Sequence, residues 1–405
     1  MTERDRTDDP APDDVLRIDD DDRYGRLRLI SWWRQERLAA AKVLVVGAGA
    51  LGNEVLKNLA LVGVGTIYVI DFDDVEPSNL SRSVLFRASD GGLPKARVAA
   101  RRAAEINPEV RYVPIRGDVL NDVGLGLFAE VDVVIGCLDN REARLWVNRQ
   151  CWKTGTPWVD AGIQEIQGVV KVFTPPHSAC YECAMTARDY QLLNLRYSCP
   201  LLKRDEILAG KVPTAPTIAS MMGALQVQEA LKLLHGMPVE GGSALVFNGV
   251  GNQFYTTKLP FRDDCLSHET YSDPVELPIG NGATVAALFD AARRVGSVSG
   301  PLHLTLDREL VEAVECPRCG GREEVMRPRT RVRQAEAECP VCREPGRPLI
   351  VSRIDEGAPL AGRSLAAVGL PPFDVARVEE EGGESRFFLL AGDRDGLASG
   401  WGLDS

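Results

Sequence analysis

The sequence predicts an α/β protein, with a doubly wound, Rossmann-like and mostly parallel sheet followed by a small α+β domain that contains a zinc ribbon. Three observations lead to this prediction. Short apolar runs alternate with helical periodicity between residues 42 and 173. A glycine-rich turn, GAGALG at 47–52, joins the first apolar run to the first helical stretch. Two CxxC pairs lie close together, at 316–319 and 339–342.

The elements are expected in the following order. Helical spacing covers 24–38, and further helices are expected at 53–61, 95–106, 217–234 and 285–295. Strands are expected at 42–46, 66–70, 111–114, 131–135, 158–160, 169–173, 244–247 and 253–258. Polar turn residues around 271–281 mark a boundary, so the predicted domains are 23–270 and 280–405, the second with short strands and a ribbon at 316–342.

Composition limits the class of protein. The chain has 405 residues, of which 44% are apolar and 26% charged, as in ordinary globular proteins. Residues 1–22 hold ten acidic residues and three arginines, so they carry −7 of the net charge of −11, and we expect a disordered acidic tail there. The nearly balanced remainder does not favour nucleic acid as a partner. The longest apolar stretch, 59–70, is too short to span a membrane, and without a secretory signal the expected location is cytoplasmic.

The glycine-rich turn predicts a nucleotide site. Gly47, Gly49 and Gly52 let the backbone approach a phosphate at the start of a helix. Asp71 follows Gly52 by 19 positions, at the end of the second strand, where a carboxylate accepts hydrogen bonds from ribose hydroxyls. By itself this pattern suits an NAD-dependent oxidoreductase, or a tight turn that binds nothing.

Four further polar residues change the expected ligand. Asn79, Arg82 and Lys95 are suited to neutralising a triphosphate, and Asp139, just after a strand, to holding Mg²⁺. Each alone is typical of a surface charge or a helix cap. Together they favour a nucleoside triphosphate over NAD.

Several motifs occur in the order known from one superfamily: RYGR at 23–26, GAGALG, DFDDVEPSNLSR at 71–82, PK at 94–95, CLDN at 137–140 and a later CxxC. Through them, residues 23–268 resemble the ThiF/MoeB/HesA superfamily of ubiquitin-activating-like adenylyltransferases. The resemblance implies an enzyme that converts ATP to AMP and pyrophosphate while it adenylates the C-terminal carboxylate of a small β-grasp protein, either ubiquitin-like or a sulfur carrier. A binding scaffold with a degenerate site is disfavoured, because the matched residues are all present.

The resemblance also assigns roles. Asp71 would bind the ribose, and Asp139 the metal. The phosphates would be bound by three side chains, Asn79, Arg82 and Lys95. Arg26 is similar to the arginine that reaches into the partner subunit's site, because family members of this compact type are homodimers. The nucleophile is already ionised, so positioning and charge neutralisation carry the chemistry and no general base is needed.

Two zinc ions per chain are expected. The family pairs Cys180 and Cys183 with a second CxxC, and in this chain the corresponding segment is Cys265-Leu-Ser-His268. Three thiolates and one imidazole complete a tetrahedral site, although His268 is also compatible with a surface histidine in a linker. The second set, Cys316, Cys319, Cys339 and Cys342, has ribbon spacing with 19 residues between the pairs, which is typical of structural zinc.

The arginines at 327, 329, 331 and 333 alternate between the two pairs of the ribbon. On a strand they would share one face. Such a face would contact nucleic acid or an acidic partner, or it would simply be solvated, which is the interpretation we favour.

Cys199 is the candidate catalytic thiol, although it is also compatible with an unreactive loop cysteine. It lies in a loop-rich stretch among Arg196, Lys203 and Arg204, which favour the thiolate, whereas Cys137 and Cys151 are expected to be packed residues. The matching loop of several family members carries the cysteine that captures the activated carboxylate. Some MoeB-like members instead stop at the adenylate, which then serves sulfur transfer in cofactor biosynthesis. Family members that transfer sulfur and have long C-terminal extensions often carry a rhodanese domain there. No rhodanese-like active-site loop is recognisable after residue 280, which favours a conjugation-type activator. A conjugating enzyme, or in the other case a sulfur donor, is the expected second partner.

Overall fold

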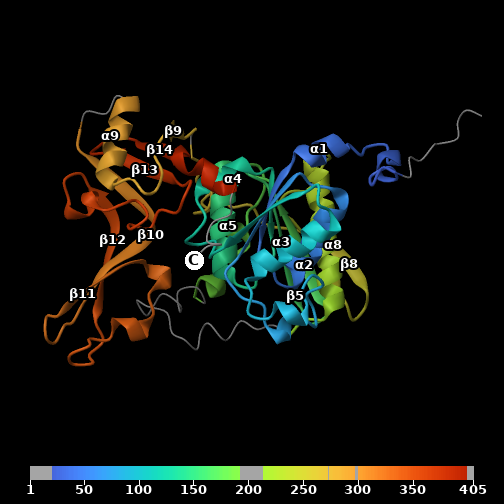
Figure 1. The fold of residues 1–405 in the computed structure, drawn as a ribbon, viewed down its shortest axis with the longest axis horizontal. Helices are drawn as coiled ribbons and strands as arrows, with labels where there is room; N and C mark the ends of the chain where they lie inside the picture. Colours follow the sequence, from blue (N-terminus) through green and yellow to red (C-terminus); the bar gives the residue numbers. More distant parts are fainter. Residues whose placement is uncertain (1–20, 192–212, 272, 297–299, 399–405) are drawn as a thin grey trace, which may run out of the picture.

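The computed structural model describes residues 21–191, 213–271, 273–296 and 300–398. Its strands form two sheets, one of eight strands and one of six, which lie beside each other (Figure 1). The expected acidic tail falls almost entirely on residues outside the described part of the chain.

The first sheet has the strand order β3-β2-β1-β4-β5-β6-β7-β8. The first five of these run parallel, and the last three are antiparallel, which confirms the predicted, mostly parallel sheet. The strands are β1 Lys42–Val46, β2 Thr66–Asp71, β3 Arg111–Arg116, β4 Val133–Gly136, β5 Trp158–Gln164, β6 Gln167–Phe173, β7 Ser243–Asn248 and β8 Gln253–Lys258. The helices along this part of the chain are α1 Gln35–Ala40, α2 Ala50–Val62, α3 Lys95–Ile106, α4 Leu125–Glu130, α5 Arg141–Thr154 and α8 Pro216–Leu234.

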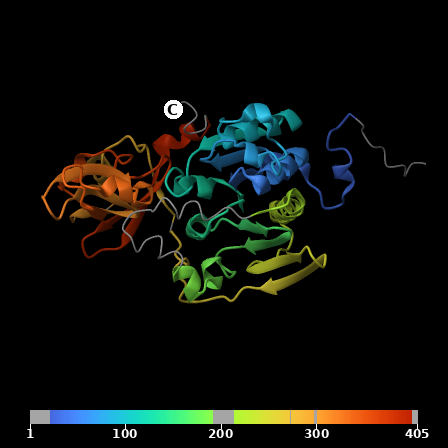
Figure 2. The same cartoon turned by 90° about the horizontal axis from the view of Figure 1, so that it is seen from below.

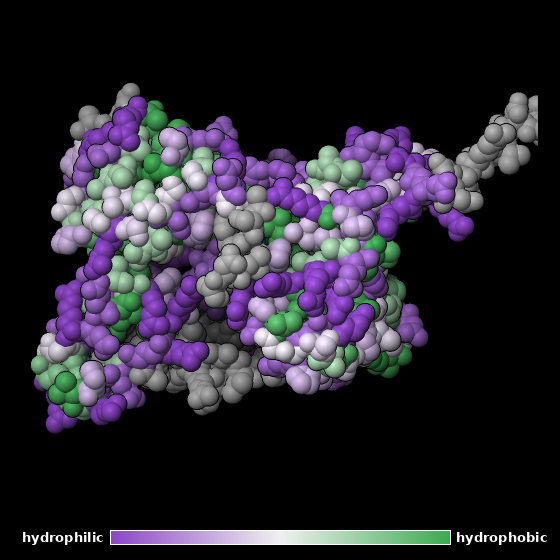
Figure 3. All heavy atoms as spheres, in the orientation of Figure 1, coloured by the Kyte–Doolittle hydropathy of each residue, from purple (hydrophilic) through white to green (hydrophobic). Residues whose placement is uncertain are grey.

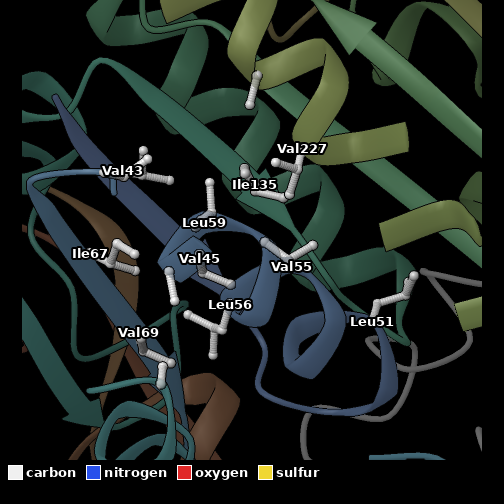
Figure 4. Close-up of a cluster of buried hydrophobic side chains, with 14 of the residues drawn as sticks. Val43, Val45, Leu51, Val55, Leu56, Leu59, Ile67, Val69, Ile135 and Val227 are labelled. Atoms are coloured by element: carbon white, nitrogen blue, oxygen red, sulfur yellow. The ribbon is translucent and has the colours of Figure 1, made fainter. Parts of the chain in front are cut away.

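Helices cover both faces of this sheet (Figure 2). Successive strand residues point to opposite faces, so Val45 packs with α2, α3 and α8, whereas Leu44 packs with α4 and α5. In Figure 4, Val55 and Leu59 of α2 lie over Val45 and Ile135, which come from neighbouring strands. The parallel strands are therefore buried on both faces, and their carboxyl ends meet along one edge.

The second sheet has the order β11-β10-β13-β14-β9, and β12 pairs with β10. Its elements are β9 Val275–Leu277, α9 Val285–Val295, β10 Leu302–Glu315, β11 Arg322–Pro328, β12 Arg347–Asp355, β13 Val375–Glu380 and β14 Ser385–Leu390. β9 comes before residue 280, so the polar stretch at 271–281 contributes a strand to this sheet. β10 is much longer than the short strands expected there.

The two sheets are joined by backbone contacts at the start of α4. The amide of Gly126 donates to the carbonyl of Phe373 (3.0 Å), and a Cβ added at Gly126 would lie 2.5 Å from that oxygen. Asp374 Oδ1 accepts a hydrogen bond from the amide of Leu125 (2.7 Å). The second unit therefore supplies the cap of a helix that belongs to the first.

Buried charges strengthen the same contact. Arg308 Nη1 lies 2.8 Å from Asp374 Oδ2, and the guanidinium also donates to the carbonyls of Leu120 and Val123 and stacks over Trp146. Both side chains of the ion pair are largely buried, and each has several partners, which offsets the cost of removing the charges from water.

The predicted helix at 24–38 is wrong. The structure has a 3-10 turn at Leu27–Leu29, and α1 begins only at Gln35. Arg34 between them is extended, and its amide donates to His235 Nε2 (3.1 Å) beyond the end of α8. A contact with a distant helix thus overrides the local apolar period.

The arginines at 327, 329, 331 and 333 do not lie on one strand, so they do not form the shared face that a strand would give. β11 ends at Pro328, and a 3-10 turn, Arg329–Arg331, follows. Arg327 and Arg329 pair with Glu336 and Glu309, and Arg331 pairs with Asp122 of the first unit.

The surface facing the viewer in Figure 3 is mostly hydrophilic, with hydrophobic residues scattered over both units. Among the described residues, no helix combines the length and the apolar character that crossing a membrane requires.

Candidate functional site

The glycine-rich turn lies between β1 and α2, at the edge where the parallel strands end. Gly47 has φ +100°, and a Cβ there would lie 2.4 Å from the carbonyl oxygen of Cys137. A Cβ at Gly52 would lie 2.0 Å from the carbonyl oxygen of Gly47. Among the described residues, a Cβ at Gly49 would meet nothing within 4 Å. Gly47 and Gly52 are therefore required by the turn itself, whereas Gly49 leaves open space beside the backbone.

Gly49 is also the N-cap of α2 and, as a glycine, makes no side-chain cap hydrogen bond. The first amides of a helix lack partners within the helix and attract anions. The open side of Gly49 therefore fits a phosphate group.

Asn53 holds the turn in place, and the sequence analysis missed it. Its side chain is fully buried; Nδ2 donates to the carbonyls of Ala48 and Gly49, and Oδ1 accepts from the amide of Leu85. The residue thus ties the turn to the loop that follows β2. An asparagine one turn into a helix carries no sequence signal for such a contact.

Asp71 ends β2 directly beside the turn. Its carboxylate accepts hydrogen bonds from the amides of Ala48 (2.7 Å) and Asp73 (2.8 Å). Burial raises the pKa of Asp71 to about 6, although Lys95 and the two amides act in the opposite direction. The carboxylate is therefore ionised near neutral pH but close to its protonation range.

This pKa predicts a pH-dependent affinity for ATP. Ionised Asp71 accepts hydrogen bonds from ribose hydroxyls and protonated Asp71 accepts them poorly, so we expect affinity to fall as the pH drops through about 6. Titration calorimetry with ATP at several pH values measures the effect. Asp71→Asn is the control, because it keeps the pH dependence of the phosphates but removes that of the carboxyl group. Parallel pH profiles for the two proteins would contradict the prediction.

The phosphate-binding candidates lie on the loop after β2 and at the start of α3. Lys95 is 8% exposed, and its Nζ lies 2.7 Å from Asp73 Oδ2. Asn79 accepts a hydrogen bond from the amide of Glu76, and Arg82 donates to the carbonyl of Ser78. The structure brings Lys95 close enough to Asp71 to influence its pKa, and Asp73, which the sequence analysis did not single out, is the present partner of Lys95.

Asp139 lies at the same edge, because β4 is the neighbour of β1 and the amide of Cys137 donates to the carbonyl of Val46 (2.8 Å). Asp139 is exposed, and Asn140 beside it caps α5 by accepting from the amide of Ala143. An exposed carboxylate at this edge has the oxygen ligands that Mg²⁺ prefers.

Arg144 stabilises the turn that contains Asp139, and the sequence analysis did not predict this role. Its guanidinium donates to Asp160 Oδ1 (3.0 Å) and to the carbonyls of Leu138 and Ala161. Lys171 stands opposite Asp160 on β6, and burial lowers the pKa of this lysine. Both basic side chains therefore lie beside Asp160 in β5, and Arg144 also contacts the Asp139 turn through Leu138.

Arg26 lies away from the glycine turn of its own chain. It is exposed, two residues after Tyr24, whose hydroxyl accepts from Asn107 (2.7 Å) and packs on Gly63 at the far end of α2. A helix of 13 residues is about 20 Å long. Tyr24, two residues before Arg26, is therefore about the length of α2 from the glycine turn of the same chain.

The structure brings together the four residues of each predicted metal site. At the first, Cys180 Sγ lies 3.7 Å from Cys183 Sγ and 3.6 Å from Cys265 Sγ, and Cys183 Sγ lies 3.3 Å from His268 Nε2. Sulfurs bound tetrahedrally to zinc at about 2.3 Å lie about 3.8 Å apart. The His268 ring also stacks on Trp152 at 4.0 Å, so this histidine is not a free surface residue.

The second set is similar. Cys316 Sγ lies 3.4 Å from Cys342 Sγ, and Cys319 Sγ lies 3.6 Å from Cys339 Sγ. A disulfide would require about 2.05 Å. Four thiolates at these separations fit a closed zinc site.

Three cysteines belong to neither cluster: Cys137, Cys151 and Cys199. Cys151 is fully buried, as predicted, and Cys137 lies behind the glycine turn. Burial raises the pKa of both thiols, so both are poor nucleophiles near neutral pH. Cys199, together with Arg196, Lys203 and Arg204, lies outside the described residues.

The fold and the open turn define a nucleotide-binding protein of the Rossmann type. The chain belongs to the ThiF family, which matches residues 22–267. Over 243 residues it is 31% identical to the sulfur carrier protein ThiS adenylyltransferase of Escherichia coli (strain K12), covering 60% of this chain and 91% of that protein. It is 36% identical over 204 residues to the human ubiquitin-like modifier-activating enzyme 7, covering 46% and 20%. The crystal structure of E. coli MccB with ATP shares the fold, with a TM-score of 0.52 and 23% identity over 64% of this chain and 76% of that one.

Proposed function

We propose that this chain is an adenylyltransferase that activates the C-terminal carboxylate of a small β-grasp protein, ubiquitin-like or sulfur-carrying. A carboxylate oxygen attacks the α-phosphorus of ATP, and the bond from that phosphorus to the β-phosphate oxygen breaks, giving an acyl-adenylate and pyrophosphate. The observation that carries the proposal is the open glycine turn with Asp71, Lys95 and Asp139 on the same edge of the sheet. The adenylyltransferases and activating enzymes among the relatives support it.

The residues divide the work. The amides at Gly49 bind phosphate, Asp71 accepts from the ribose, Lys95 and Arg82 neutralise the phosphates, and Asn79 donates a hydrogen bond to them. Mg²⁺ held by Asp139 would supply further charge neutralisation at the phosphates. Since Lys95 is paired with Asp73 in the structure, the triphosphate competes with Asp73 for this lysine.

Carrier-dependent exchange of labelled pyrophosphate into ATP tests the proposal. Asp139→Ala should lower the exchange rate to about 1% of wild type or less, because the metal loses its carboxylate. Asp290→Ala removes another exposed carboxylate, on α9, and should leave the rate unchanged. Wild-type exchange in Asp139→Ala would remove this residue from the site.

We further propose a homodimer in which Arg26 serves the partner's site. Its place two residues after Tyr24, which is about the length of α2 from the glycine turn of the same chain, supports this arrangement. Arg26→Ala and Lys95→Ala should each be inactive, and mixing them should restore exchange, because one site of the mixed dimer keeps both residues. Absence of recovery after demonstrated subunit exchange would return Arg26 to its own chain or to no role.

Two zinc ions complete the proposal, one for each cysteine cluster. Neither donor set leaves an open position, so the role of zinc would be structural. We propose that the reaction takes place in the cytoplasm, where the thiolates of both clusters stay reduced. Two later fates stay open: a thioester at Cys199 that is passed to a conjugating enzyme, or sulfur transfer from a donor to the adenylate.

A further inference from the structure

Each metal-ligating segment of the first cluster carries one buried polar residue between its ligands. Glu182 lies between Cys180 and Cys183, and Ser267 lies between Cys265 and His268. The side chain of Glu182 is completely buried, and Ser267 is 2% exposed. Ser267 Oγ donates a hydrogen bond to Glu182 Oε2. The two segments, about 85 residues apart in the sequence, are therefore linked by a contact that needs no metal.

The carboxylate of Glu182 has further partners. Arg149 of α5 donates from Nη2 to Oε1 (3.0 Å), and the Tyr190 hydroxyl donates to the same oxygen (2.9 Å). Arg262 Nη2 donates to the backbone carbonyl of Glu182 (3.2 Å). A buried carboxylate is tolerated when several donors, including a charged one, replace water.

Helix α5 reaches this cluster with two residues on one face. Arg149 bonds to Glu182, and Trp152, three positions further along the helix, stacks on the His268 ring. The segment 180–183 is thus attached to α5 through the Glu182 carboxylate, and the segment 265–268 is attached to it through the His268 imidazole. The same helix begins at the Asp139 turn, where Asn140 is its N-cap.

We propose that Glu182 is a positioning residue that closes the two ligand segments of the first metal site on each other and fastens them to α5. This role is separate from the adenylation proposed above, because Glu182 binds neither metal nor nucleotide. Groups that orient metal ligands typically contribute 10- to 100-fold to metal affinity. Substitution of Glu182 should therefore weaken metal binding at the first cluster and leave the four-cysteine cluster unchanged.

Cadmium-113 substitution of the full-length protein separates the two sites. Three sulfurs with one nitrogen and four sulfurs give different cadmium resonances, so loss of each metal to EDTA is followed individually. Glu182→Ala should bind cadmium about 10- to 100-fold more weakly at the first cluster, and Ser267→Ala should show a smaller change of the same kind. Glu182→Gln keeps an oxygen that accepts from Ser267, so it should recover part of the loss. Glu312→Gln, whose carboxylate pairs with Arg322 on the surface, should change neither resonance.

Unchanged cadmium affinity at the first cluster in both Glu182→Ala and Ser267→Ala would overturn the proposal. If Glu182→Ala does not fold, Ser267→Ala decides alone, because it removes a single hydroxyl group. Equal loss from both clusters would also overturn it, because that pattern indicates general destabilisation. A wild-type protein without the mixed sulfur and nitrogen resonance would remove the metal site itself, while pyrophosphate exchange still tests adenylation separately.

Discussion

Gly49→Val is expected to fold normally and to lose measurable binding of ATP, with carrier-dependent exchange at background. A Cβ at this position meets no atom within 4 Å from the part of the chain that the structure describes, and the backbone is extended (φ −76°, ψ −152°), so the described fold accepts the branched side chain. The added carbons would fill the space where the first amides of α2 meet the phosphates. Titration calorimetry with ATP measures the loss, and a thermal melt measures folding.

Two other glycines make this test specific. Gly282→Val is the matched control, because a Cβ there also has no described atom within 4 Å but lies far along the chain, just ahead of α9; ATP binding should be unchanged. Gly47→Val should instead lower the melting temperature, because φ is +100° and the carbonyl of Cys137 leaves no room. Wild-type affinity in Gly49→Val would place the phosphates elsewhere.

Cys199→Ala is expected to abolish a thiol-sensitive adduct with the carrier protein while ATP–pyrophosphate exchange continues at the wild-type rate. Seven of the ten cysteines belong to the two clusters, and burial raises the pKa of Cys137 and Cys151. Cys199 is left, and the basic residues around it in the sequence favour the nucleophilic thiolate. Gel electrophoresis with and without reductant, with intact mass measurement, detects the adduct.

Cys151→Ala is the control for this experiment, because it removes a buried thiol and should keep the adduct. An adduct that persists in Cys199→Ala would assign the acceptor to another cysteine. If the wild-type protein performs exchange with its carrier but forms no adduct, the chain stops at the adenylate. Sulfur transfer would then be the favoured fate.

Local signals were sufficient for much of the fold. α3 spans the predicted residues 95–106, because an Asn-Pro pair follows it, and α9 spans the predicted 285–295. α2 ends where Gly63 adopts the left-handed conformation. β10 could not be predicted in the same way, because its register shifts between Val311 and Ala313 interrupt the alternation that marks a strand.

The residues of the candidate site also divide into those that local sequence signals predict and those that only the fold brings together. Glycine spacing and the residues after β2 and β4 identify the edge of the sheet, because parallel strands bring their ends together. Asn53, Arg144 and Glu182 were missed, because each acts through partners that the fold alone brings near. His268 was found only because another cysteine pair led to a search for the remaining ligands. Trp152, which stacks on its ring, had no such signal.

Asp374 in the second part of the chain caps α4 in the first part. Replacing either part by itself would therefore lower the stability of the protein. A recombination event that replaced the second part by an unrelated one would remove a helix cap, worth about 1 kcal/mol. It would also take away the Arg308 guanidinium from two carbonyls, at about 1.5–3 kcal/mol for each hydrogen bond to a charged group. A viable exchange would need an incoming part with an acidic residue and an arginine in equivalent places. We therefore expect the extension and the nucleotide-binding part to be inherited together among descendants of this protein.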